Sequence, residues 1–160
     1  MAIQIGNQAP EFTLPDQLGV LHNLTQYRGR WIVLYFYPKD DTPGCTKEAC
    51  SFRDNFESLK EKGIVVLGVS KDTQASHKKF SEKYNLNFTL LSDESTEMIK
   101  RYEAFGEKKF MGKTFQGILR TTYVIDPQGI VRKVYENVKP QDHAQEILRD
   151  IVSLQQENNI

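Results

Sequence analysis

Two uninterrupted apolar runs, residues 31–37 and 64–70, constrain the fold more than any other feature of the sequence. Both runs are bounded by glycine or polar turns, and the first is rich in aromatic and branched side chains, which is typical of buried strands. Between them, residues 43–62 place apolar side chains at helical spacing and end at Gly63, a residue that favours helix C-caps. This order of strand, helix and strand indicates an α/β sheet covered on both faces.

The alternation continues along the rest of the chain. We expect a short strand, a turn and a second short strand before a helical turn at Leu24. Further helices are expected over residues 72–84 and 95–105 and from Pro140 to about Gln155. Further strands are expected at residues 88–91, 121–125 and 131–135. Residues 106–117 contain three glycines and are expected to form a loop. The predicted fold is a single α/β domain over residues 1–160, with three layers, a central mixed sheet, helices on both faces and an N-terminal β-hairpin.

The overall charge of the chain does not indicate a nucleic-acid or membrane partner. The chain has 21 basic and 21 acidic residues, so its formal net charge of zero offers no electrostatic case for nucleic acid or an anionic membrane. The N-terminus lacks a basic region followed by an apolar core, which disfavours a secretion signal, and no apolar stretch approaches the length of a membrane span. We therefore expect a cytoplasmic protein.

The chain has two cysteines, Cys45 and Cys50. A reducing cytosol would not maintain a structural disulfide framework, so the pair indicates either transient redox chemistry or coincidence. A zinc site would need two more ligands, and His22, His77 and His143 are scattered without ligand spacing. We expect neither a metal site nor an organic cofactor.

Cys45 lies close to a predicted helix start. Thr42 is a plausible N-cap and Pro43 suits the first helical position, which makes Cys45 the third residue of the helix. A free thiol has a pKa of about 8.5, and the positive end of a helix dipole lowers it. Cys45 is therefore a candidate thiolate, although a small buried hydrophobic residue is an equally good interpretation of this position alone.

Helical geometry separates the two cysteines. At about 100° per residue, Cys50 falls about 140° from Cys45 and roughly 7.5 Å further along the axis, so the two sulfurs cannot bond within an intact helix. The apolar stripe that shares the face of Cys45 consists of Ala49, Phe52, Phe56 and Leu59. If Cys50 is merely structural, the thiols stay independent; if it is a partner of Cys45, the helix start must unwind, which Gly44 favours.

The spacing of Pro38, Thr42 and Cys45 reproduces the Pro-x-x-x-Thr-x-x-Cys motif of the peroxiredoxins. The string over residues 35–50 resembles the bacterioferritin comigratory protein, or peroxiredoxin Q, branch of that family. Further similarity lies in the opening Gly-x-x-Ala-Pro-x-Phe and in residues 68–72, 111–113 and 120–122. The resemblance covers nearly the whole chain and implies a thioredoxin-like fold and a thiol peroxidase.

The resemblance assigns roles to individual residues. Cys45 is the expected peroxidatic cysteine and Cys50 the expected resolving cysteine. Arg120 would favour the thiolate and polarise the peroxide, where the alternative is a surface ion pair. Thr42 would offer its hydroxyl to the peroxide, or serve as a cap alone. Pro38 would shield the pocket, although a plain turn proline would look identical.

Glu48 has two interpretations in the same motif. It could orient Arg120 or Thr42, but an exposed glutamate on the helix surface is the interpretation that the sequence favours.

The implied reaction reduces hydrogen peroxide and organic hydroperoxides through a Cys45 sulfenic acid, an intramolecular disulfide with Cys50 and recycling by thioredoxin. The branch favours a monomer, while Phe110 or Phe115 could serve a weak dimer. The alternatives are a thioredoxin-like disulfide oxidoreductase and a non-catalytic binding domain on the same fold. The sequence does not indicate whether hydrogen peroxide or an organic hydroperoxide is the preferred substrate. The segment 106–117 is expected to border the substrate pocket.

Overall fold

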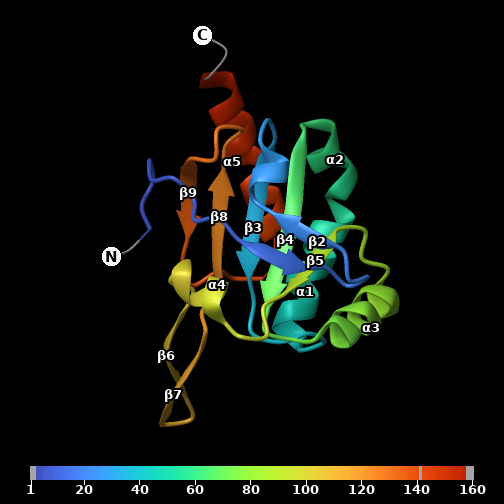
Figure 1. Ribbon diagram of the computed structural model, residues 1–160, viewed down its shortest axis with the longest axis vertical. Coiled ribbons are helices and arrows are strands. Elements are labelled where there is room, and N and C mark those ends of the chain that lie inside the picture. The colour runs from blue at the N-terminus through green and yellow to red at the C-terminus, as the bar shows by residue number, and fades with distance from the viewer. Residues whose placement is uncertain (1–2, 141, 158–160) are drawn as a thin grey trace.

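The computed structural model describes residues 3–140 and 142–157 and is built on a five-stranded mixed sheet (Figure 1). In spatial order the strands are β5 (Thr89–Ser92), β4 (Ile64–Ser70), β3 (Trp31–Phe36), β8 (Thr121–Ile125) and β9 (Val131–Tyr135). The pairs β3–β4 and β4–β5 are parallel, whereas β3–β8 and β8–β9 are antiparallel. This arrangement confirms the predicted mixed sheet.

The central strand β3 is buried on both faces because its alternate side chains enter two different apolar clusters. Val33 and Tyr35 pack in the cluster beneath α1 (Pro43–Asp54), α2 (Phe56–Glu61), α3 (Gln74–Tyr84) and α5 (His143–Glu157). Ile32 and Leu34 point to the opposite face, which α4 (Glu97–Arg101) and the N-terminal segment cover.

That N-terminal segment contains the expected hairpin of β1 (Thr13–Pro15) and β2 (Leu21–Asn23), followed by a helical turn, η1 (Thr25–Tyr27). The three-layer prediction is confirmed. Within the described part of the chain, no helix is long and apolar enough to span a membrane.

The single helix predicted over residues 43–62 is in fact two helices, α1 and α2, that meet at Asn55. The Asn55 side chain donates a hydrogen bond to the Ser51 carbonyl at 2.8 Å, so it competes with the backbone for that acceptor. Such local competition is the reason that asparagine is a poor interior helix residue.

The loop predicted over residues 106–117 is a β-hairpin, which corrects the sequence interpretation. Strands β6 (Phe105–Phe110) and β7 (Lys113–Ile118) pair in antiparallel register, and they are joined by Met111 and Gly112. Both turn residues have positive φ, as expected of the tight turns that match strand twist. Because most of the hairpin is solvent-exposed, its sequence carries no alternation of apolar and polar residues that would indicate strands.

Two predicted helix boundaries are also wrong. The helix expected over residues 95–105 is limited to α4, since Thr96 and Glu103 on either side have positive φ. The last helix begins at His143 rather than at Pro140, because Asp142 has a φ of 59°, outside the helical region. Residue 141 lies outside the described residues.

Candidate active site

Cys45 lies at the carboxyl end of β3, where the chain turns through residues 37–42 into α1. It is the third residue of the helix, as predicted, and its side chain is only 1% exposed. This edge of a parallel or mixed sheet is where α/β proteins bind ligands.

Thr42 occupies the predicted N-cap position with extended backbone angles, but its hydroxyl does not cap the helix. The Oγ1 atom instead donates a hydrogen bond to the Lys39 carbonyl at 2.9 Å, which closes the loop on itself. Pro38 is half-buried on this loop and, lacking an N–H, offers the site mainly its ring.

Arg120 reaches the cysteine from the other side of β3. In the antiparallel pairing Thr121 lies opposite Phe36, so Arg120 stands beside the end of β3 from which the loop of residues 37–42 departs. Its Nη2 atom donates a hydrogen bond to the Cys45 sulfur at 3.2 Å. The permanent cation of Arg120 is therefore in direct contact with the buried sulfur.

Glu48 is buried, which corrects the expectation of an exposed helical glutamate. Its carboxylate is 0% exposed, and Oε1 lies 3.3 Å from Arg120 Nη1. Burial raises the pKa of Glu48 to about 7, and the attraction of Arg120 opposes that rise. Within the described residues its Oε2 atom has no hydrogen-bond partner. The guanidinium of Arg120 is thus held between the sulfur and this carboxylate.

Gly44 makes room for this arrangement. A Cβ atom at Gly44 would lie 2.6 Å from Arg120 Nη2, closer than any van der Waals contact, and 3.6 Å from Pro140 Cγ. The absence of a side chain at residue 44 therefore allows the guanidinium to reach the Cys45 sulfur.

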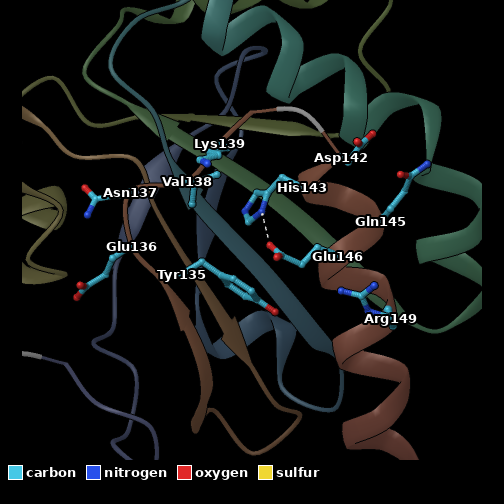
Figure 2. A pocket seen from close by; sticks show the side chains of 10 residues that line it. All are labelled: Tyr135, Glu136, Asn137, Val138, Lys139, Asp142, His143, Gln145, Glu146 and Arg149. Atoms are coloured by element: carbon cyan, nitrogen blue, oxygen red, sulfur yellow. Dashed lines mark hydrogen bonds and ion pairs between the residues drawn. The ribbon is translucent and has the colours of Figure 1, made fainter.

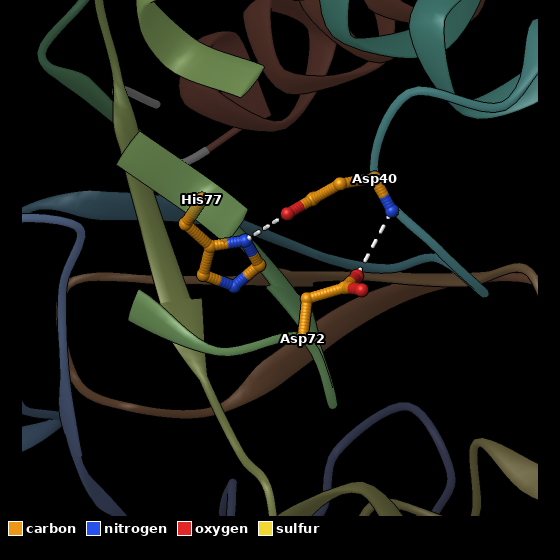
Figure 3. Close-up of side chains that lie close together, drawn as sticks. All are labelled: Asp40, Asp72 and His77. Atoms are coloured by element: carbon orange, nitrogen blue, oxygen red, sulfur yellow. Dashed lines mark hydrogen bonds and ion pairs between the residues drawn. The ribbon is translucent and has the colours of Figure 1, made fainter. Parts of the chain in front are cut away.

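The buried residue Asp40 anchors the loop that carries Pro38 and Thr42. The Asp40 carboxylate accepts hydrogen bonds from the hydroxyls of Tyr37 (2.6 Å) and Ser76 (2.8 Å), and it lies 2.7 Å from His77 Nδ1. The backbone N–H of Asp40 donates to Asp72 Oδ2 at 2.9 Å (Figure 3). These bonds tie the loop to α3 and to the end of β4.

Both ring nitrogens of His77 have a partner in this cluster. Nε2 lies 2.9 Å from the Leu91 carbonyl, and Nδ1 lies 2.7 Å from the Asp40 carboxylate. The ligand-type atoms of Asp40, Asp72 and His77 lie within 4.8 Å of one another. Since the facing atoms are joined by hydrogen bonds, we interpret the cluster as a clamp for the loop.

Cys50 lies one and a half turns beyond Cys45 on α1 and is partly exposed. Both cysteines are free thiols. A pocket of about 350 Å³ opens at Cys50 between α1 and the start of α5. Beside it, the backbone N–H of Ala144 donates to Ser51 Oγ at 3.3 Å, which joins α5 to the middle of α1.

A larger pocket, of about 590 Å³, lies between β9 and α5 (Figure 2). Glu136, Lys139 and Arg149 are among the polar residues that line it, and His143 lies beside Glu146. Burial lowers the pKa of His143, and Glu146 partly offsets this. Neither cysteine lines this pocket, so its size does not make it the reaction site.

Comparison with known proteins agrees with this geometry. Residues 5–134 match the model of the AhpC/TSA family. The chain belongs to this family. It is 46% identical to Peroxiredoxin Bcp of Bacillus subtilis over 94% of this chain and 96% of the relative, and 45% identical to Peroxiredoxin Bcp of Escherichia coli over 91% and 94%. The crystal structure of a peroxiredoxin Q variant from Xylella fastidiosa superposes with a TM-score of 0.90, at 30% identity, over 96% of this chain and 98% of that one.

These relatives confirm the peroxiredoxin family, the thioredoxin-like fold and the thiol peroxidase activity expected from the sequence. The structure brings Cys45, Arg120 and Thr42 to one end of β3. The predicted exposure of Glu48 is wrong. Its position three residues after Cys45 on one helix does indicate that the two side chains lie on neighbouring parts of the helix surface. The clamp at Asp40 and His77 was missed entirely, because its two residues are 37 positions apart.

Proposed function

We propose that Cys45 is the peroxidatic cysteine of this peroxiredoxin, that Cys50 resolves it, and that Arg120, Thr42 and Pro38 form the peroxide pocket. The observation that carries this assignment is the 3.2 Å hydrogen bond from Arg120 to the buried Cys45 sulfur. A cysteine that only fills space in the core does not account for a neighbouring cation, and an arginine in a surface ion pair does not account for a contact with a buried sulfur.

In the first step the Cys45 thiolate attacks one peroxide oxygen in line with the O–O bond. The S–O bond forms as the O–O bond breaks, and the departing hydroxide or alkoxide takes up a proton to leave as water or alcohol. Arg120 is positioned to stabilise the negative charge that develops on the departing oxygen. The product on the enzyme is the Cys45 sulfenic acid.

In the second step Cys50 attacks the Cys45 sulfur, so that an S–S bond forms, the S–O bond breaks and water leaves. This step requires α1 to unwind, because five residues of helix place the two Cα atoms about 7.5 Å apart along the axis, beyond disulfide range. Unwinding would break the Ser51–Ala144 hydrogen bond and release Gly44 from beneath Arg120.

In the third step a dithiol reductant of the thioredoxin type attacks the disulfide and restores both thiols. Cys50 is the better target for that attack, since it is the more exposed of the two and lies in an open pocket. The substrates are hydrogen peroxide and organic hydroperoxides. The chain acts as a single domain, in our proposal as a monomer of the cytoplasm, where a reduced dithiol pool supports the cycle.

The test is a pair of variants, Cys45→Ser and Cys50→Ser, treated with one equivalent of peroxide and then with excess thioredoxin. Cys50→Ser should retain one fast oxidation of Cys45, accumulate a sulfenic acid that dimedone traps, and form no intramolecular disulfide. Cys45→Ser should show no fast reaction with peroxide.

Unchanged turnover of Cys50→Ser with thioredoxin would remove Cys50 from the resolving role. Fast peroxide reduction by Cys45→Ser would remove Cys45 from the peroxidatic role. Reduction of protein disulfides without peroxide, at a rate equal to peroxide turnover, would support the disulfide oxidoreductase instead.

A further inference from the structure

The hairpin formed by β6 and β7 exposes apolar side chains at its tip. Phe110 is 68% exposed, Met111 is 85% exposed and Phe115 is 47% exposed. The hairpin forms a separate two-stranded sheet and projects away from the body of the molecule beyond α4 (Figure 1). Exposed apolar groups that cluster in this way mark interaction surfaces more often than chance exposure does.

The pairing of the two strands gathers these groups on one side. Phe110 lies opposite Lys113, and Lys108 lies opposite Phe115, so the four side chains share one face of the hairpin. Met111 lies in the turn that joins the two strands. Both aromatic rings therefore stand beside lysine side chains.

The exposed charge at the tip is positive. Lys109 and Lys113 are both exposed, whereas the Lys108 ammonium is drawn back to the hairpin base, where it donates to the Ile118 carbonyl at 2.8 Å. Glu107 is the one acidic residue among positions 107–116. The chain as a whole is electrically neutral, so this local excess is not evident from composition.

We propose that the tip of the β6–β7 hairpin docks on an anionic phospholipid surface, with Phe110, Met111 and Phe115 entering the interface and Lys109 and Lys113 contacting lipid phosphates. Aromatic and methionine side chains enter the boundary between headgroups and acyl chains, and lysines beside them add attraction to anionic lipids. The contact is peripheral and reversible, since only a few side chains take part.

A lipid surface fits this tip better than a second copy of the chain. In a two-fold symmetric contact the same patch meets itself, so one interface would contain the lysines of both hairpins and no acidic residue except Glu107 from this segment. A narrow projecting turn also offers little of the roughly 800 Å² per partner that a stable protein interface buries. A planar anionic surface has neither disadvantage.

Docking in this manner would set the active site close to the membrane. The base of the hairpin leads directly into Arg120, since β7 ends at Ile118 and Arg120 follows after Leu119. The Lys108 ammonium is close enough to this site that burial first and then the charge of Arg120 lower its pKa. The hairpin thus connects the exposed tip with the residues around Cys45.

The experiment measures co-sedimentation of the full-length reduced protein with vesicles of phosphatidylglycerol and phosphatidylcholine, and with vesicles of phosphatidylcholine alone. We expect binding to the anionic vesicles that weakens as salt is added. The double variant Phe110→Ser/Met111→Ser should lower the partition coefficient on the order of tenfold. Lys109→Gln and Lys113→Gln should each lower it about fivefold.

The matched control is Leu18→Ser/Val20→Ser, which removes two other exposed apolar side chains, 74% and 56% exposed, from a turn that has no lysine beside it. This control should bind vesicles as the wild type does. Equal binding of the control and the hairpin variants, or no binding of the wild type to anionic vesicles, would overturn the proposal. A protein dimer in solution that Phe110→Ser/Met111→Ser dissociates, without vesicle binding, would assign the tip to a second copy instead.

Discussion

Glu48 Oε1 and Arg120 Nη1 lie 3.3 Å apart in an ion pair whose carboxylate is completely shielded from water. Burial of a charge is unfavourable unless its partners compensate, and here the second carboxylate oxygen has no partner within the described part of the chain. The pair therefore gives Arg120 a fixed direction toward Cys45 at a cost in stability.

Glu48→Gln should change how stability depends on pH. The folded-state pKa of Glu48, about 7, is above its unfolded value of 4.5, so the folded state binds the proton more tightly. The resulting stability is fully present below pH 4.5 and is lost as pH rises through about 7. Relative to Glu48→Gln, the wild type should therefore lose up to about 3 kcal/mol over this range. Urea denaturation of both proteins at several pH values measures the difference.

The control for this experiment is Glu57→Gln, an exposed glutamate in the first turn of α2. It should leave the pH dependence of unfolding as in the wild type. Parallel pH profiles for the wild type and Glu48→Gln would show that Glu48 does not titrate differently in the folded and unfolded states.

Arg120→Lys should slow the oxidation of Cys45 by about 100-fold. The guanidinium contacts the Cys45 sulfur through Nη2 and Glu48 through Nη1 at the same time, and a lysine ammonium cannot span both positions. The rate is measured by competition with a second peroxidase for limiting peroxide. Arg132→Lys, at the Asp126 end of the sheet, is the control and should react at the wild-type rate. A wild-type rate for Arg120→Lys as well would mean that positive charge alone is sufficient.

Gly44→Ala should lower the rate of Cys45 oxidation and leave the stability of the protein nearly unchanged. Alanine is favoured over glycine within a helix by up to about 1 kcal/mol, so α1 should not be weakened by the change itself. The new methyl group would, however, lie 2.6 Å from Arg120 Nη2 and displace the guanidinium from the Cys45 sulfur. We expect slower oxidation of Cys45 with little loss in the urea midpoint. Full activity in this variant would contradict the close approach.

His77→Gln should destabilise the protein by about 3 kcal/mol, because it removes the ring nitrogen that lies 2.7 Å from the buried Asp40 carboxylate and leaves that carboxylate with one partner fewer. His22→Gln is a matched control, since His22 also lies 2.7 Å from an aspartate, Asp16, but in a partly exposed pair. The control should lose about 1 kcal/mol or less. Urea denaturation compares the two, and equal losses would show that burial does not strengthen the pair at Asp40.

The sequence was sufficient wherever the controlling interactions are local. The apolar runs predicted β3 and β4, and the Thr42-Pro43 pair correctly placed the start of α1 with Cys45 as its third residue. Helical spacing also placed Cys45 on the apolar face of the helix and Cys50 away from it, and in the structure Cys45 is buried whereas Cys50 is partly exposed. These features depend on residues within one or two turns of each other, so their pattern is visible in the chain itself.

Tertiary structure decided the features that depend on distant residues. The guanidinium of Arg120 meets Cys45 across 75 positions because β3 and β8 pair, and His77 meets Asp40 across 37. The burial of Glu48 depends on the same assembly, as one face of α1 is covered only when the sheet forms. Most of the hairpin of β6 and β7 lies outside the core, against which only its base at Phe105 and Ile118 packs, so the sequence has no apolar alternation by which to predict it. A sequence determines local conformation through nearest neighbours, whereas the environment of a charge is set by whichever distant segments exclude water from it.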